Sequence, residues 1–151
     1  MKTDLVVAGY IFDNDKVLLT HHKKLRLWLP VGGHINKDET PDAALLREIK
    51  EETNLNVEIL SNNGISLEGN VRKNLAVPFH ANVHSVGDHD HCCFFYLCKV
   101  LNSKKLKINN ELEDFRWVSK NGLNGKEIPL DVRNIGMRAF EILEETNNPN
   151  R

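Results

Sequence analysis

A strongly signalled helix over residues 40–54 is the feature that most constrains the fold of this chain. Thr40 is a good N-cap, and Pro41 suits the first helical position because no amide hydrogen is needed there. Asn54 can adopt the left-handed conformation that closes a helix, and the strand-like run Leu55–Leu60 follows it. We therefore expect a helix that starts at Thr40 or Pro41 and ends at Asn54.

Three glutamates share one face of this predicted helix. At about 100° per residue, Glu48, Glu51 and Glu52 together span roughly a third of the helix circumference. The side chains that project the other way are Leu45, Leu46, Ile49 and Thr53. Like charges at this spacing repel one another, and a divalent cation would turn that cost into binding energy. Oxygen-only ligands favour Mg²⁺, with Mn²⁺ as the alternative.

Two features next to the helix add to the acidic face. Gly32 and Gly33 form a break where backbone carbonyls could approach an ion without a side chain in the way, and Glu39 adds a fourth acid before the first turn. The competing interpretation is a solvated helix face, with which Arg47 and Lys50 are compatible.

The spacing of these residues resembles the signature of the Nudix hydrolases, G-x5-E-x7-R-E-U-x-E-E-x-G-U, in which U is a bulky aliphatic residue. The positions in register are Gly33, Glu39, Arg47, Glu48, Ile49, Glu51, Glu52 and Leu55. Asn54 departs from the pattern, since the family usually has Gly there, but Asn tolerates a positive φ at modest cost. The resemblance is close over residues 28–55 and loose over about Leu5–Ser119.

This resemblance implies hydrolysis of a diphosphate linkage in a nucleoside diphosphate derivative, a small molecule, by metal-assisted attack of water on phosphorus. Glu48, Glu51 and Glu52 would ligate the metal together with the Gly33 carbonyl, and one glutamate could double as the base. The alternative is a Nudix-like nucleotide-binding or sensor domain without turnover. The sequence leaves nucleoside triphosphates, nucleotide sugars and dinucleoside polyphosphates open as substrates.

Further site residues follow from the same resemblance. Arg47 would orient the acids by forking onto Glu39 or Glu51. Glu111 lies in a region where several Nudix enzymes place an additional metal ligand or base, and Glu113 is the alternative.

Substrate contacts are predicted from residue type alone. Lys23, Lys24 and Arg26 could hold phosphates, although a solvated hairpin is the competing interpretation. Trp28 and Phe79 could stack on a base, although packing in the core competes with that role.

Composition and charge favour a single domain over residues 1–151, which the resemblance implies is a Nudix hydrolase domain. Hydrophobic residues make up 40% of the chain and charged residues 27%, and the formal net charge of −1 gives no strong nucleic-acid or membrane signal. No apolar stretch approaches the ~20 residues of a spanning helix, and the N-terminal LVVAGYIF suits a strand better than a signal peptide. We expect a cytoplasmic protein, for which a homodimer is possible.

A second metal site can be considered in the segment 80–93. Its candidate ligands are His80, His84, His89, His91, Cys92 and Cys93. Only His80 and His84 have a spacing typical of structural zinc ligands, and their segment looks extended. We therefore interpret these side chains as ordinary strand and loop residues. The three cysteines, Cys98 included, are expected to be reduced thiols. His89 and His91 could instead lie near the substrate.

The remaining elements are predicted from apolar periodicity and turn residues. Strands are expected at Leu5–Phe12 and Lys16–Thr20, which form a hairpin, and at Val57–Leu60, Val77–Val83, Cys92–Leu101 and Phe115–Ser119. Asp131 should cap a second helix, Asp131–Glu145, whose apolar stripe is Val132, Ile135, Ala139, Ile142 and Leu143, and the tail Thr146–Arg151 should be frayed.

Strands and helices interleave without regular alternation, which predicts an α/β (α+β) fold. Its architecture should be the Nudix-like mixed sheet sandwiched between α-helices. The glutamates would face a cleft bordered by the hairpin 21–28 and the loops 61–74 and 109–114.

Overall fold

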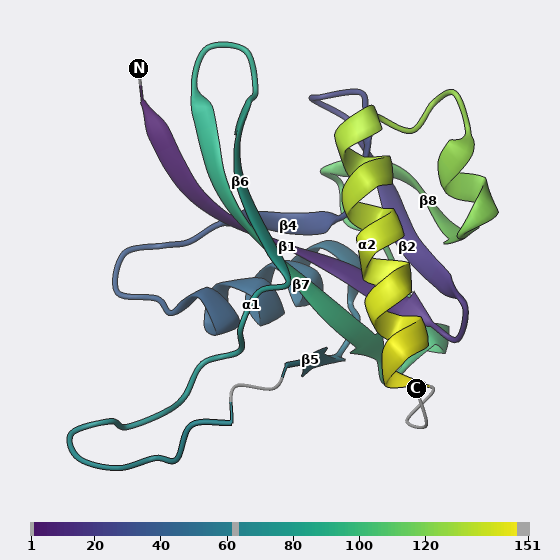
Figure 1. The fold of residues 1–151 in the computed structure, drawn as a ribbon. Helices are drawn as coiled ribbons and strands as arrows, with labels where there is room; N and C mark the ends of the chain where they lie inside the picture. Colours follow the sequence, from purple (N-terminus) through teal and green to yellow (C-terminus); the bar gives the residue numbers. More distant parts are fainter. Residues whose placement is uncertain (1, 62–63, 148–151) are drawn as a thin grey trace.

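A twisted mixed sheet forms the centre of the protein, seen here in a computed structural model that describes residues 2–61 and 64–147 (Figure 1). Its strands are β1 (Thr3–Asp13), β2 (Lys16–His22), β3 (Trp28–Leu29), β4 (Val31–His34), β5 (Val57–Leu60), β6 (His80–Ser85), β7 (Asp90–Val100) and β8 (Leu112–Ser119). The helices are α1 (Pro41–Thr53), α2 (Leu130–Thr146) and the short 3₁₀ turns η1 (Ser103–Lys105) and η2 (Asn121–Asn124).

The long strands β1 and β7 run side by side and organise the sheet. They are parallel, with Thr3 opposite Asp90 and Phe12 opposite Lys99, and every other strand pair is antiparallel. The order β3-β2-β1-β7-β5 is extended by β4 on β1, β6 on β7 and β8 on β2. Both β2 and β4 pair with β1, so the segment between them returns the chain to the centre of the sheet.

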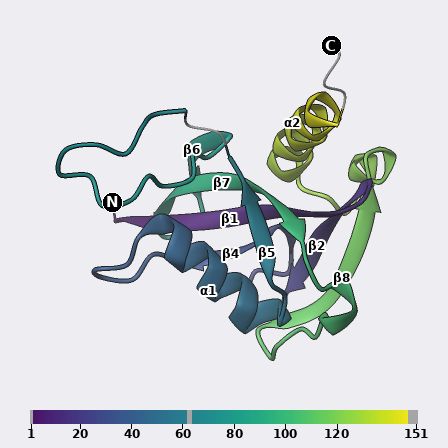
Figure 2. The ribbon, with the colours of Figure 1, turned by 90° about the horizontal axis from the view of Figure 1, so that it is seen from below.

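The two long helices cover opposite faces of the sheet, as Figure 2 shows. Strand β1 contributes side chains to the packing against both helices, because successive strand residues point to opposite faces of the sheet. Tyr10 and Phe12 pack in the cluster that contains α2, whereas Val7 and Ile11 pack in the cluster that contains α1. This arrangement confirms the predicted mixed sheet between helices.

Helix α1 has the predicted bounds. The Thr40 hydroxyl accepts a hydrogen bond from the Ala43 amide at 3.2 Å, and Asn54 closes the helix at φ = 62°. Leu45 and Ile49 are fully buried on its inner face. Leu46 was expected there too, but it is 43% exposed.

Several strand boundaries differ from the predictions. β6 occupies His80–Ser85 in place of Val77–Val83, whereas β5 has its predicted bounds, Val57–Leu60. β8 begins at Leu112, inside the predicted loop 109–114, because β2 continues to His22 and pairs with it. The ends of these strands are set by the neighbouring strands with which they pair, and the local sequence carries no information about those neighbours.

Helix α2 begins at Leu130, one residue before the predicted start. Pro129 occupies the N-cap and no side chain caps the helix, so the prediction that Asp131 is the cap was wrong. The predicted stripe does face the core: Val132, Ile135 and Ala139 are buried. Of the predicted frayed tail, Thr146 is the last helical residue, and residues 148–151 lie outside the described part of the chain. Neither long helix in the described ranges has the length and apolar character needed to cross a bilayer.

Candidate active site

The acidic face of α1 borders a cleft of about 1080 Å³. Glu48, Glu51 and Glu52 all line it, as predicted from their helical spacing. They differ in burial: the Glu51 side chain is 56% exposed and that of Glu48 14%, whereas Glu52 is buried. Three carboxylates with graded access to water therefore face one space.

The glycine pair on β4 brings the backbone against these carboxylates. A Cβ atom added to Gly33 would lie 2.4 Å from Cδ of Glu48, and one added to Gly32 would lie 2.0 Å from the Val7 carbonyl oxygen. A side chain at Gly32 would meet backbone, and one at Gly33 would displace the end of the Glu48 side chain. Both glycines line the cleft, beside the carboxylates that the signature pairs with them.

Arg47 holds the acids together from behind. Its Nε and Nη2 donate to the two Glu39 oxygens at 2.7 and 3.0 Å, which is a bidentate fork. Its Nη1 donates to Glu48 at 2.9 Å and to Glu51 at 3.3 Å, and Nη2 also donates to the His34 carbonyl at 3.0 Å. The hydrogen bond from Arg47 lowers the pKa of Glu39 to about 2. Arg47 thus contacts both of the acids between which the sequence left a choice.

Glu52 is the most perturbed acid of the site. Burial, followed by the charges of Glu48 and Glu111, raises its pKa to about 8, against a smaller opposing effect from a hydrogen bond to the Gly32 backbone. Burial also raises the pKa of Glu48 in spite of Arg47. Negative charge is therefore unfavourable here until a cation enters.

A distant segment adds Glu111 to the same cleft. The Asn109 amide donates to the Glu52 carbonyl at 2.9 Å, and the Lys23 amide donates to the Glu111 carbonyl at 3.1 Å. The first bond docks the loop before β8 against the end of α1, the second joins it to the residue after β2, and Glu111 lines the cleft. Glu113, the alternative, instead pairs with His21 at 2.9 Å and does not line it.

The predicted substrate contacts divide into two groups. Lys23 and Lys24 line the cleft, whereas Arg26 does not. Trp28 is only 6% exposed, and the Arg116 guanidinium carbon lies 4.4 Å from its ring centroid. Phe79 packs with its edge toward Tyr10, at 5.8 Å between centroids. Both aromatic rings therefore pack against other side chains of the protein, in agreement with the interpretation that competed with base stacking.

The expected border formed by the loop 61–74 was wrong, since none of its described residues lines the cleft. The chain that follows β5 leads instead to the opposite end of α1, where the Ala76 amide donates to Asp42 at 2.9 Å. Asp42 is in the first turn of the helix, and the glutamates are in its C-terminal half.

The cleft also holds a group that the sequence indicated only in part. Asp4, His34, His89 and His91 gather there, with one ligand atom from each within 4.8 Å of the others. His89 and His91 had been considered as candidates, but Asp4 and His34 join them through strand pairing and not through sequence spacing. His80, Cys92 and Cys93 lie outside this group in the described chain, and the three cysteines are free thiols.

Comparisons with known proteins agree on one family. The NUDIX domain family matches residues 2–137. A NUDIX-family hydrolase from Clostridium perfringens is 32% identical, with a TM-score of 0.84 over 95% of this chain and 99% of that one. None of the curated proteins compared with the chain matches it.

Two more distant structures share the fold. The MutT protein from Methanosarcina mazei Go1 is 18% identical, with a TM-score of 0.71 over 96% of this chain and 95% of that one. An Ap4A hydrolase from C. elegans is 15% identical, with a TM-score of 0.68 over 95% of this chain and 98% of that one. At these identities the likeness extends to the fold alone.

Proposed function

Because this chain belongs to the NUDIX family and is a Nudix-type hydrolase, we propose that it cleaves the diphosphate linkage of a nucleoside diphosphate derivative with the help of Mg²⁺. Mn²⁺ is the alternative ion, and the substrate is a small molecule held in the cleft beside α1. The proposal assigns the metal to Glu48, Glu51 and Glu52, with the Gly33 carbonyl as a further ligand.

The observation that carries this proposal is the uncompensated charge at the cleft. Arg47 pairs with Glu39, Glu48 and Glu51, but Glu52 and Glu111 have no ion pair within residues 2–61 and 64–147. A buried carboxylate without a partner is costly. An all-oxygen donor set with this excess of negative charge fits a hard divalent cation, so the residues present suit the ion that the family implies.

In this proposal the residues of the cleft have different roles in hydrolysis. When bound, the metal supplies Lewis-acid stabilisation of the phosphate and lowers the pKa of water. Arg47 fixes the carboxylates so that they need not reorganise during the reaction. Lys23 and Lys24, which line the cleft, offer positive charge to the substrate phosphates. One of the glutamates, or Glu111, takes the proton of the attacking water.

Turnover tests the proposal directly. We expect a panel of nucleoside triphosphates, nucleotide sugars and dinucleoside polyphosphates to give product with at least one member when Mg²⁺ is present. With that substrate, Glu52→Gln should lower kcat/KM at least ~100-fold, because it removes a charge from the centre of the site. Glu58→Gln is the matched control, since Glu58 is exposed on β5 and should leave the rate unchanged.

Two results would contradict the proposal. Unchanged turnover by Glu52→Gln would remove the assigned chemistry. Absence of product across the whole panel, with a nucleotide still bound in the cleft, would favour the binding or sensor domain.

A further inference from the structure

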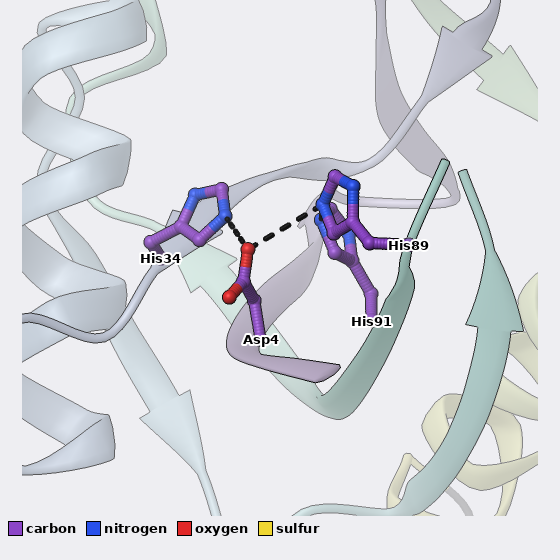
Figure 3. Close-up of side chains that lie close together, drawn as sticks. All are labelled: Asp4, His34, His89 and His91. Atoms are coloured by element: carbon purple, nitrogen blue, oxygen red, sulfur yellow. Dashed lines mark hydrogen bonds and ion pairs between the residues drawn. The ribbon is translucent and has the colours of Figure 1, made fainter. Parts of the chain in front are cut away.

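We propose that Asp4, His34, His89 and His91 form a second metal site, selective for Zn²⁺ and separate from the glutamates of α1. Figure 3 shows the four side chains converging from three strands and a turn. The proposal concerns other ligands and another metal than the proposed hydrolysis, so it does not depend on that function.

Strand register brings the four residues together. Asp4 on β1 is paired with His91 on the parallel strand β7. His34, the last residue of β4, is paired with Val6, which lies two residues from Asp4 and therefore on the same face of β1. His89 belongs to the turn between β6 and β7 and completes the group. Because central strands hold three of the four residues, their backbone positions are fixed before any ion binds.

The distances between ligand atoms suit a tetrahedral zinc ion. Asp4 Oδ2 lies 3.2 Å from His34 Nε2 and 3.4 Å from His89 Nε2, and His89 Nε2 lies 3.3 Å from His91 Nε2. With Zn–N and Zn–O bonds of about 2.0–2.1 Å, the edges of a tetrahedron are about 3.3 Å long. Three of the six edges already have this length, and the other ligand atoms lie within 4.8 Å of one another.

Hydrogen bonding outside the group orients one ligand as zinc proteins require. His89 Nδ1 lies 2.7 Å from Asp88 Oδ1, so a carboxylate outside the group holds the far nitrogen of this ring. His89 Nε2 faces Asp4 Oδ2 at 3.4 Å and His91 Nε2 at 3.3 Å, inside the group. A carboxylate on the far nitrogen of a ligating histidine is the usual outer support of a zinc site.

The donor set distinguishes this site from the one on α1. Three imidazoles and one carboxylate suit Zn²⁺ or Co²⁺, whereas Mg²⁺ prefers oxygen ligands and retains its waters. The two sites share the cleft, and His34 directly follows Gly33. The His34 side chain is 57% exposed, so a bound ion would remain accessible to water or to a phosphate oxygen in the cleft.

Metal titration of the tag-free, metal-free protein tests the proposal. In excess Mg²⁺, which occupies the oxygen site, we expect one Zn²⁺ per chain to be taken from a chromophoric chelator. Co²⁺ should give the intense visible bands of tetrahedral coordination, without the charge-transfer band of a cysteine ligand. Both His89→Ala and His91→Ala should weaken Zn²⁺ binding at least ~10-fold, by comparison with the effect of losing even an outer-shell partner.

Two variants serve as controls. His80→Ala removes an exposed histidine of β6 that lies outside the group, and it should leave Zn²⁺ affinity unchanged. Glu52→Gln should also leave it unchanged, because Glu52 belongs to the other site. If a histidine variant fails to give the circular dichroism spectrum of the parent, Asp4→Asn tests the same site, since it keeps the shape of the side chain but removes its charge.

Three results would overturn the proposal. The first is no Zn²⁺ uptake in competition with the chelator. The second is uptake that Asp4→Asn, His89→Ala and His91→Ala leave intact. The third is uptake that Glu52→Gln abolishes. In each case the four residues would form only a hydrogen-bonded network.

Discussion

Glu52 couples the stability of the protein to pH and to metal. Its ordinary pKa of 4.5 rises to about 8 in the folded protein, mainly through burial. Folding therefore favours the protonated acid, and the stability gained from it is complete below about pH 4.5 and is lost as the pH rises toward 8. We expect the free energy of unfolding of the metal-free protein to fall across this window by a few kcal/mol from this group.

Urea unfolding at a series of pH values checks this expectation. The free energy of unfolding of Glu52→Gln should depend less on pH than that of the parent over the same window, because the amide does not titrate. Saturating Mg²⁺ should also reduce the pH dependence of the parent's free energy of unfolding, since the ion stabilises the ionised carboxylate. Identical pH slopes for the parent and Glu52→Gln would refute the link.

Gly33 is predicted to be needed for the position of Glu48. The Cβ of Gly33→Ala would overlap the Glu48 carboxylate, at 2.4 Å from Cδ, and all the nearest atoms belong to that side chain. We expect the variant to lose ~1–3 kcal/mol of stability, which is typical of overpacking, together with most of its activity. In the double variant with Glu48→Ala, most of this stability loss should be absent, because the overlapping atoms are gone.

The adjacent glycine provides the matched comparison in this double-mutant cycle. Gly32→Ala overlaps the Val7 backbone at 2.0 Å, which Glu48→Ala cannot relieve. Chemical denaturation of the parent, the three single variants and the two double variants measures both coupling energies. A coupling energy near zero between Gly33→Ala and Glu48→Ala would show that the overlap is relieved elsewhere.

At the scale of elements, the end of α1 depends on Asn54 in the place of the usual glycine. Asn54 adopts φ = 62°, its amide donates to the Lys50 carbonyl at 3.0 Å, and its side-chain amide donates to the Lys105 carbonyl at 3.1 Å. Asn54→Ala should cost ~1–2 kcal/mol, because alanine is strained in this conformation and cannot donate. Asn54→Gly should stay within ~0.5 kcal/mol of the parent, because the lost bond offsets the relieved strain.

Thermal or urea unfolding checks these values against Asn56→Ala. Asn56 is also exposed and close by, but its hydrogen bonds to Asn102 and Leu101 come from its backbone amide and carbonyl, so truncating its side chain should change little. Equal losses for Asn54→Ala and Asn54→Gly would assign the whole effect to the bond with Lys105.

Elements defined by local signals were predictable from the sequence, and elements defined by pairing were not. The caps of α1 lie in its own residues, Thr40 and Asn54, so its bounds could be predicted. β4 contains Gly32 and Gly33, which are poor strand formers, and it is a strand only because β1 lies beside it. The start of α2 was misjudged for a related reason: Asp131 is a good cap by type, but Pro129 already occupies that position.

At the scale of the whole molecule, the sequence identified the acidic face and left the rest of the cleft open. Helical periodicity placed Glu48, Glu51 and Glu52 on one side of α1 without any knowledge of the sheet. The remaining walls depend on which strands are neighbours. For this reason Trp28 lies in the core and the partly buried Phe79 packs against it, and Asp4 meets His91 only through the parallel pairing of β1 and β7.

The same argument gives Glu111 a testable role at this scale. It belongs to the loop before β8, yet it raises the pKa of Glu52 through its charge and lines the same cleft. If this loop completes the metal and water site, Glu111→Gln should lower kcat/KM at least ~10-fold and weaken Mg²⁺ dependence. Glu113→Gln, two residues away, should leave both unchanged, because Glu113 pairs with His21 outside the cleft.

Steady-state kinetics over a Mg²⁺ titration distinguishes this role from a structural one. A carboxylate that only supports the loop would change stability and KM together, and the Mg²⁺ concentration at half-maximal rate would stay constant. A carboxylate that acts on the metal or the water shifts that concentration, or it lowers kcat while the protein stays folded. Equal effects of Glu111→Gln and Glu113→Gln would show that the loop, and not the Glu111 carboxylate, is what the site requires.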